Sequence, residues 1–481
     1  MVKDILDIVA FRNRVINAVS GGKALLALFA LPEHVLCAVL GDREKRSAET
    51  LFAAVEGDEY PSLTPQCPQA HMFEREIAEQ YDIAPLGHPW LKPVRFHRPY
   101  RAGAKVFAET GPAVCDFFRV EGAEIHEVAV GPVHAGIIEP GHFRFQCYGE
   151  NVLHLDIALG FQHRGAERAL VSNPKRRIFY METLAGDTTI GHTLAYCRNI
   201  ESLGGMQISE SAEAARAVAL ELERLANHAG DLGALAGDIG YLPTMSFCGR
   251  LRGDFLNMTA LLCGSRFGRG LLRGGGLRRP VTKEIADELL SRLIAAEADL
   301  KNAVELLWNT PSVLARFENT GVISAENAVA LGLAGPCARA CGLGIDARKD
   351  FPSGIYLKRE FEPAVCATGD VYARAMTRWI ECRDSIALIK EILPAAVCGP
   401  EPEAKPALAP DSLSVSVEEG WRGEICHIAR TDARGQLDFY KVVDPSFRNW
   451  PGLALAMRGQ QISDFPLCNK SFNLSYCGHD L

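Results

Sequence analysis

Two histidines stand among glycines and prolines in residues 131–145, a segment that begins Gly-Pro-Val-His and continues to Gly-His-Phe-Arg. They are His134 and His142. The ordinary pKa of histidine lies near neutrality, so either imidazole could donate a proton to a carbonyl under reduction or relay one. Turn composition alone would also explain the segment. The residues by themselves leave a chemical and a structural interpretation open.

Charged side chains gather at two further places. The sequence His-Arg-Gly-Ala-Glu-Arg at 163–168 contains Arg164 and Glu167, which could form a salt-bridged network or line a route for protons. In Glu-Leu-Glu-Arg-Leu-Ala-Asn-His at 221–228, Arg224 and His228 are four residues apart and share a face if the segment is helical. The simpler interpretations are a salt-bridged network in the first segment and a pair on a helix surface in the second.

The composition argues against a nucleic-acid-binding or disulfide-rich protein. The chain has 481 residues, a formal charge of -8 and 15 cysteines. An acidic balance without a basic stripe disfavours nucleic acid as a partner. An odd number of scattered cysteines in apolar surroundings predicts buried thiols in a reducing compartment. The spacing of Cys337 and Cys341, with no second pair nearby, does not predict a zinc site.

The sequence has neither a signal peptide pattern at its start nor an uninterrupted apolar run of the roughly 18 residues needed to cross a membrane. If the protein works at a membrane, we expect other subunits to hold it there as a peripheral component.

The elements that must position these residues differ between the two ends of the chain. Up to about residue 110, apolar runs at 24–31 and 35–40 predict two buried strands joined by a tight connection, and 73–83 predict an amphipathic helix with its charges opposite the apolar face. We place the boundary of this unit between residues 98 and 120.

From residue 121 the pattern passes through a strand-like stretch and becomes mainly helical. Apolar residues at helical spacing predict three long core helices, hence a bundle, and alternation at 413–417 and 425–430 predicts a small sheet. The predicted class is α+β, with a small α/β domain at 1–110 and a mainly helical domain with small β elements at 121–481. The three stripes are Val218, Leu222, Leu225, Ala229 and Leu232; Ile285, Leu289, Leu293, Ala296, Leu300, Val304 and Leu307; and Met376, Trp379, Cys382, Ile386, Ile389 and Leu393.

The first domain carries a local signature. Phe-Glu-Arg-Glu at 73–76, Tyr-x-Ile at 81–83 and Gly-His-Pro at 87–89 resemble the small peripheral subunit of respiratory complex I. In formate-hydrogenlyase-type hydrogenases that subunit is fused ahead of the large subunit, and the order of the two parts here is the same.

The second domain, from Glu124 to the C-terminus, resembles the large subunit that complex I shares with membrane-bound nickel-iron hydrogenases. The resemblance rests on several motifs in the same order along the chain. They are Gly-Pro-x-His, His-Arg-Gly-x-Glu, Gly-His-x-x-Ala-Tyr, Glu-Leu-x-Arg-x-x-Asn-His, Gly-Pro-x-x-Arg, Asp-x-Arg-Lys and Asp-Pro-Ser-Phe.

The metal-ligand positions of that family are empty of cysteine. The resemblance aligns the four nickel-iron cysteines with Ala185, Thr188, Ser446 and Asn449. A soft metal centre needs thiolates, so we expect no metal site and no cofactor of its own in this chain. The tyrosine with which complex I binds a quinone headgroup aligns with Gly186, next to Asp187, so a quinone would have to be bound differently.

The resemblance implies a subunit of an energy-converting redox complex at the cytoplasmic face of a membrane. It would take electrons from an iron-sulfur cluster in a small partner subunit and couple them to ion movement in integral membrane partners. Two alternatives stay open: a large subunit of a quinone reductase, and a non-catalytic structural subunit. The implied catalytic residues are His134, His142, Asp187, Glu167 and Arg164, and the implied cofactor-binding residues are His134, His142 and His192.

Metal analysis of the purified protein is predicted to find no stoichiometric nickel, because none of the four aligned positions supplies a thiolate. A nickel-containing hydrogenase purified in parallel serves as the positive control. One nickel per chain after removal of loosely bound metal would contradict the prediction.

Overall fold

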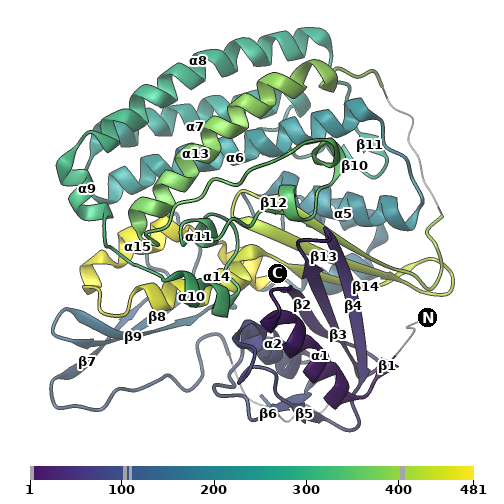
Figure 1. The fold of residues 1–481 in the computed structure, drawn as a ribbon, viewed down its shortest axis with the longest axis vertical. Coiled ribbons are helices and arrows are strands. Elements are labelled where there is room, and N and C mark those ends of the chain that lie inside the picture. Colours follow the sequence, from purple (N-terminus) through teal and green to yellow (C-terminus); the bar gives the residue numbers. More distant parts are fainter. Residues whose placement is uncertain (1–4, 101–105, 108–110, 401–406) are drawn as a thin grey trace.

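The computed structural model describes residues 5–100, 106–107, 111–400 and 407–481 (Figure 1). Its N-terminal part is built on a four-stranded sheet of order β1-β4-β3-β2, in which β1 is parallel to β4 and the other neighbours are antiparallel. The predicted strand pair is therefore confirmed as β2 and β3. The elements are β1 (Ile5–Leu6), α1 (Ile8–Ser20), β2 (Ala24–Leu31), β3 (Val35–Asp42) and β4 (Ser47–Ala54).

The predicted helix is α2 (His71–Tyr81), flanked by the parallel pair β5 (Glu59–Pro61) and β6 (Ala84–Leu86). Its apolar face is buried as expected, but the expectation that its charged side lies free opposite that face is wrong. Glu74, Glu76 and Glu79 are at most 1% exposed. Each carboxylate is held by hydrogen bonds, so a helix that looks amphipathic in sequence is buried on all sides.

Residues 131–145 comprise the long loop of a β-hairpin and the start of its second strand. Strands β7 (Ile125–Val130), β8 (His142–Tyr148) and β9 (Asn151–Ala158) form an antiparallel sheet in that order, and residues 131–141 join the first two. The short helices α3 (Ala166–Ser172) and α4 (Arg177–Met181) lead from this sheet into α5 (Thr189–Leu203).

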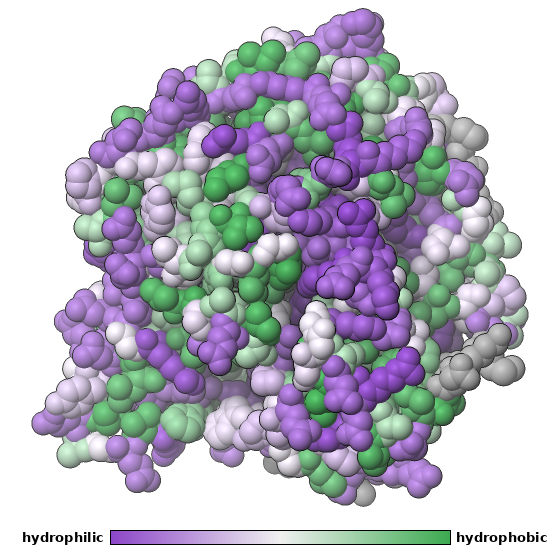
Figure 2. All heavy atoms as spheres, in the orientation of Figure 1, coloured by the Kyte–Doolittle hydropathy of each residue, from purple (hydrophilic) through white to green (hydrophobic). Residues whose placement is uncertain are grey.

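Four long helices form the layer at the top of Figure 1: α6 (Glu210–Asp238), α7 (Leu242–Cys263), α8 (Lys283–Trp308) and α13 (Val371–Ile392). The three predicted stripes lie on α6, α8 and α13 and are largely buried in one core cluster. The sequence analysis missed α7, whose glycines and polar residues interrupt its periodicity. On the outer surface, hydrophilic side chains are interspersed with hydrophobic ones (Figure 2).

The predicted C-terminal sheet is also confirmed and has a third strand. Strands β12 (Leu413–Gly420), β13 (Gly423–Thr431) and β14 (Leu437–Val443) form an antiparallel sheet, and α5 packs against β12 and β13. Helices α14 (Pro445–Ala456), α15 (Phe465–Phe472) and α16 (Tyr476–Asp480) complete the chain. The class α+β is thus confirmed.

The remaining elements are short. They are β10 (Leu272–Arg273), β11 (Gly276–Leu277), α9 (Pro311–Phe317), α10 (Ala325–Leu331), α11 (Gly335–Arg339), α12 (Ala347–Asp350), and 3₁₀ turns at Pro68–Ala70, Pro174–Arg176, Gly354–Lys358, Leu393–Ala396 and Ile462–Asp464.

The N-terminal sheet and the C-terminal sheet share one hydrophobic core. The rings of Phe29 and Phe439 stack with centroids 5.3 Å apart, and those of Phe73 and Phe447 lie 5.2 Å apart. Aromatic pairs of this kind add to the stabilisation that burial alone supplies. The division at residue 110 stays a prediction, since part of the proposed boundary lies outside the described residues.

A buried charge cluster fastens the same two parts together. The Lys441 ammonium on β14 lies 2.7 Å from Glu76 of α2 and 3.0 Å from Glu167 of α3, and Arg95 also pairs with Glu76. Burial raises the pKa of Glu76, but Lys441 and Arg95 outweigh it and lower that pKa to about 2. The carboxylate therefore stays ionised throughout the neutral range.

Replacing Lys441 with methionine is predicted to lower the free energy of unfolding by about 3–5 kcal/mol, because it leaves buried carboxylates without one of their counter-charges. Glu33→Gln is the matched control, since Glu33 also joins the two parts, through Arg430, but is 56% exposed. The control is expected to cost at most about 1 kcal/mol. Chemical denaturation of the full chain measures both, and equal effects would contradict the prediction.

Candidate functional site

An ion pair between Asp187 and Arg422 lies where two segments distant in sequence meet. Asp187 stands just before α5, and Arg422 occupies the two-residue turn between β12 and β13. The guanidinium donates to both carboxylate oxygens, at 2.6 and 2.8 Å. Burial raises the pKa of Asp187, but Arg422 more than offsets this and holds the pKa below its usual value. The pair is thus ionised and bidentate, the strongest geometry for such a contact.

Arg224 positions the turn that carries Arg422. Its guanidinium donates to the backbone carbonyls of Gly420 and Glu419, at 3.1 and 2.8 Å. The expectation that Arg224 and His228 form a helix-surface pair is wrong, because both are fully buried. They belong to a buried charge network next to the turn. This network holds the turn in place but does not contact the ion pair of Asp187 and Arg422.

Four buried side chains form a continuous chain of hydrogen bonds behind this ion pair. Asp444 caps α14 and lies 3.0 Å from Nε2 of His192, and Nδ1 of His192 lies 3.1 Å from Nε2 of His427. Nδ1 of His427 is 2.9 Å from the Tyr440 hydroxyl. Burial, followed by the neighbouring His192, lowers the pKa of His427 well below its usual value, so that ring is neutral. We call this series the Asp-His-His-Tyr chain.

A protonated carboxyl lies at the start of α5. Glu223 accepts hydrogen bonds from the backbone N–H groups of Ile190 and Gly191, at 2.7 and 3.1 Å. Burial raises the pKa of Glu223 to about 8, with Asp187 adding to the effect, although the two N–H groups act against it. Glu223 and Asp187 both line a cavity of about 10 Å³, close to the space that one water molecule needs.

The four positions aligned with metal ligands do not fit a nickel-iron centre. Ala185 offers no donor, Thr188 accepts from an indole N–H at 3.1 Å, and Ser446 accepts a backbone hydrogen bond of 2.9 Å. Asn449 makes hydrogen bonds of 2.9 and 3.1 Å with the backbone of Ala334. The polar atoms at these positions bind other parts of the protein, and none is the thiolate that a soft metal requires. Within the described ranges no cluster of three or more acidic, histidine or cysteine side chains is arranged to hold a metal ion.

His134 reaches the same region through α16. Its Nε2 lies 3.3 Å from the Tyr476 hydroxyl, and Glu139 of the same loop accepts from the backbone N–H of Cys477 at 3.1 Å. The thiol of Cys477 is hydrogen-bonded in turn to the backbone of Gly186. The hairpin loop and the loop before α5 therefore lie on either side of α16.

His142 lies apart from that cluster. It is the first residue of β8, next to Phe143, and adjacent residues of a strand point to opposite faces. Phe143 contacts the ring of His134, whereas His142 contacts the ring of Phe117 at 5.5 Å. Nε2 of His142 is buried and has no hydrogen-bond partner among the residues that the structure describes. The structure does not bring His142 together with Asp187.

Arg164 and Glu167 hold the surroundings of the site in place. Arg164 donates to the carbonyls of Thr183 and Leu184, at 2.7 and 2.6 Å, which fixes the loop that leads to Asp187. Glu167 accepts from a backbone N–H of β14 at 2.9 Å and pairs with Lys441. Their position agrees with the network interpretation of the segment at 163–168.

Sequence reasoning missed Arg422, Glu223, His427 and Tyr440 as site residues. Arg422 follows an alternating strand and looks like an ordinary turn residue, and His427 and Tyr440 stand singly in strands. Glu223 lies inside the motif at 221–228, which drew attention to its arginine and histidine instead. The only available signal was the alternation of side chains along the predicted strands, which indicates which strand residues face α5.

At the positions that the motifs align with metal ligands, the structure instead has contacts to the ion pair and to the Asp-His-His-Tyr chain, through Thr188 and Ser446. Comparison with known proteins places the chain more closely. Residues 238–412 match the family described as the 49 Kd subunit of respiratory-chain NADH dehydrogenase, and residues 32–104 match its 30 Kd subunit. None of the helices in the described part of the chain is long and apolar enough to cross a membrane.

Three relatives illustrate the similarity. The carbon monoxide-induced hydrogenase of Rhodospirillum rubrum is 31% identical over 72% of this chain and 97% of its own length. Hydrogenase-4 component G of Escherichia coli is 28% identical over 88% of this chain and 76% of its own length. An NADH-quinone oxidoreductase subunit of Clostridium beijerinckii is 31% identical over 65% of this chain and 82% of its own length.

The chain therefore belongs to the family of large subunits that such hydrogenases share with the 49 Kd subunit of NADH dehydrogenase, with a segment like the 30 Kd subunit fused ahead of it. The resemblance drawn from the motifs is confirmed. The relatives in this comparison are named as hydrogenases, a hydrogenase component and a subunit of NADH-quinone oxidoreductase, all proteins of redox chemistry.

Glu223 is predicted to lose its proton near pH 8, so a difference infrared spectrum across that pH should show the loss of a protonated carboxyl band. The folded pKa lies above the unfolded one, so this group's contribution to stability should fall as pH rises from about 4.5 to about 8. The Glu223→Gln variant should lack both effects. Glu288→Gln, on the exposed face of α8, is the control, and a band that persists in Glu223→Gln would contradict the assignment.

Proposed function

We propose that this subunit carries the site at which the complex exchanges protons with its redox substrate, with electrons arriving from an iron-sulfur cluster in a partner subunit and with no nickel-iron centre in this chain. The single observation that carries the proposal is the Asp-His-His-Tyr chain. Four polar side chains, each at most 2% exposed, are joined end to end by hydrogen bonds of 2.9–3.1 Å. A structural role alone would not require a continuous series that runs from a hydroxyl through two imidazoles, which can each donate and accept, to a carboxylate that accepts.

The series can move one proton without moving a heavy atom. If Tyr440 donates to Nδ1 of His427, Nε2 of His427 can donate to His192, and His192 can donate to Asp444. Entry of one proton at the Tyr440 hydroxyl then protonates the Asp444 carboxylate, which can pass that proton on, and each imidazole changes tautomer. A two-electron reduction that protonates its substrate consumes protons, so a supply of this kind matches the chemistry.

The ion pair of Asp187 and Arg422 would contact the substrate directly. Asp187 is 32% exposed, so one edge of the pair is accessible. A fixed guanidinium stabilises negative charge that develops on a substrate oxygen. Glu223 is protonated near neutrality and lines a water-sized cavity together with Asp187. It would supply a proton to the ion pair through that cavity.

Quinone reduction is the second candidate, because His134 offers a suitable donor. Its imidazole is hydrogen-bonded to the Tyr476 hydroxyl, and both lie at the loop that meets the Asp187 side across α16. Because Nδ1 of His134 already faces the Pro132 carbonyl at 3.2 Å, a quinone oxygen would take the place of the Tyr476 hydroxyl at Nε2 of the protonated ring. His142, with its unpartnered Nε2, is a further candidate donor at a separate place. A purely structural subunit is the rival to both.

The hairpin loop also supports a partner subunit. Val133 is 81% exposed and Ile137 is 99% exposed, and large apolar side chains gathered on one loop commonly mark a contact surface. We propose that the iron-sulfur subunit covers this loop. Integral membrane subunits that translocate an ion would then hold the chain at the cytoplasmic face of the membrane.

Breaking the chain of hydrogen bonds tests the proposal. His427→Gln and Tyr440→Phe are predicted to reduce turnover per assembled complex about a hundredfold or more, in line with the loss of a positioned acid or base. The assay uses a reduced viologen dye as donor and a short-chain quinone as acceptor, in vesicles that also report an ion gradient. Turnover should show an altered pH profile in both variants.

Tyr196→Phe is the matched control, since its ring lies 6.1 Å from that of Tyr440 but belongs to no link of the series. Equal losses in the control and in Tyr440→Phe, proportional to loss of assembled complex, would favour the structural rival. Unchanged turnover in both test variants would contradict proton transfer through this series.

A further inference from the structure

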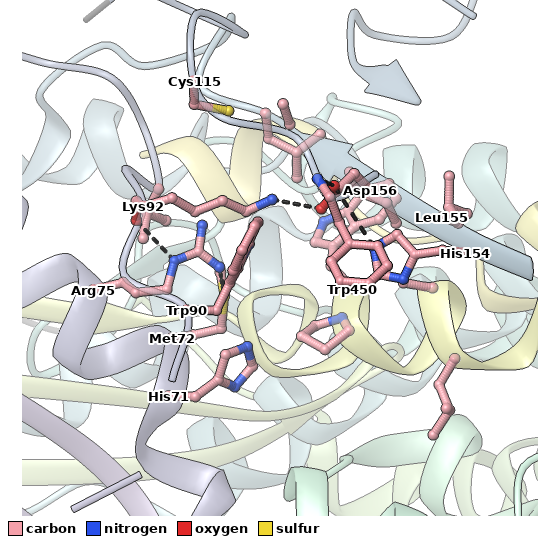
Figure 3. A pocket seen from close by; sticks show the side chains of 18 of the residues that line it. His71, Met72, Arg75, Trp90, Lys92, Cys115, His154, Leu155, Asp156 and Trp450 are labelled. Carbon is pink, nitrogen blue, oxygen red and sulfur yellow. Dashed lines mark hydrogen bonds and ion pairs between the residues drawn. The ribbon is translucent and has the colours of Figure 1, made fainter. Parts of the chain in front are cut away.

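A second cavity, of about 710 Å³, lies between the N-terminal part and the helices that follow the C-terminal sheet. Its walls come from α2, the segment after β6, strand β9 and α14 (Figure 3). Asp187, His192 and Arg422 are not among the residues that line it. It is therefore separate from the site described above, and the inference drawn from it does not depend on the proposed function.

The cavity contains a buried positive charge without a counter-charge. Arg75 is 8% exposed, and its Nε and Nη2 donate to the backbone carbonyls of Lys92 and Pro93, each at 2.8 Å. Nη1 has only the thioether of Met72, at 3.3 Å, which is a weak acceptor. In the described part of the chain no carboxylate lies within ion-pair distance of this guanidinium.

The second cation of the cavity is already paired. Lys92 lies 2.6 Å from Asp156 on the opposite wall, and Figure 3 shows Arg75 and Lys92 extending into the same space. Asp156 is the ion-pair partner of Lys92, whereas Glu79 and Asp156 act on Arg75 only from beyond ion-pair distance. Burial lowers the pKa of Arg75 to about 10, which still leaves it charged at neutral pH. Exposed Arg458 adds positive charge at the rim.

Apart from four histidines, the rest of the lining is largely apolar. Leu155, Leu331, Trp450 and Ala454 form much of the wall away from Arg75, and the exposed ring of Trp90 stands near Lys92. Cavities of about 300–1,000 Å³ with apolar walls and a few polar groups are typical of small-molecule sites. One end of this one is cationic and the other apolar.

We propose that this cavity binds a long-chain carboxylate, with its head on Arg75 and its apolar chain along the wall formed by β9 and α14. A carboxylate matches one unpaired guanidinium and can accept from Nη1, a charge-assisted hydrogen bond that the protein leaves unmade. A dianionic head is less suitable, because Asp156 would face its second charge. The apolar walls account for the chain, since an inorganic anion would leave them in contact with water.

The test measures binding of radiolabelled palmitate to the purified complex that contains the full chain. One site per chain is expected. Arg75→Gln should weaken palmitate binding about tenfold or more, as expected for the loss of a hydrogen bond to a charged group. It should barely change the weaker binding of the corresponding long-chain alcohol. Arg14→Gln, on exposed α1, removes the same charge elsewhere and should have no effect.

Ala454→Phe provides a second route, because it fills the apolar wall without touching a charge, and should abolish binding of both ligands. Equal affinity for acid and alcohol, or unchanged binding in Arg75→Gln and Ala454→Phe, would overturn the proposal. The proposal would also be overturned if the isolated chain bound palmitate and the assembled complex did not. A segment of a partner subunit would then fill the cavity.

Discussion

The neutralisation of buried negative charge around the loop before α5 is the constraint on which the site depends. Two aspartates, Asp187 and Asp444, stand near the positions that the motif resemblance aligns with metal ligands. Here a guanidinium supplies the positive charge, and the turn between β12 and β13 delivers it. Arg224 of α6 holds that turn through its backbone carbonyls, so hydrogen bonds connect the helical layer, the small sheet and the site. A guanidinium has fixed geometry and no redox chemistry, which is why the proposed function assigns the electron carriers to other subunits.

Much of the fold could be predicted from the sequence, because apolar periodicity reports burial directly. The strand pair at 24–31 and 35–40, the stripes of α6, α8 and α13 and the strands near 413 and 425 all follow from that signal. It failed for α7, where glycines break the stripe, and for the charged side of α2. Glu74, Glu76 and Glu79 look like solvent-facing residues in sequence, and only the fold reveals the donors that make their burial tolerable.

The site was only partly predictable for a related reason. Motif order identified Asp187 and His192 as residues of interest, and the fold places them in one cluster. Arg422, His427 and Tyr440 contribute through contacts across more than two hundred residues or across strands, and single residues in strands carry no local signature. The resemblance implied a catalytic role for His142 as well as for His134, and strand alternation places His142 on the face opposite Phe143, which contacts His134.

The core shared by the N-terminal and C-terminal sheets has a consequence for how the complex is made. When two subunits meet as separate chains, their pairing depends on concentration and on equal synthesis. With Phe29 stacked on Phe439 inside a single polypeptide, the encounter becomes intramolecular and the ratio of the two parts is fixed at translation. Orphan copies of either part cannot accumulate, and a ribosome must finish β14 before the first sheet can complete its packing. The order of synthesis thereby becomes part of the assembly pathway.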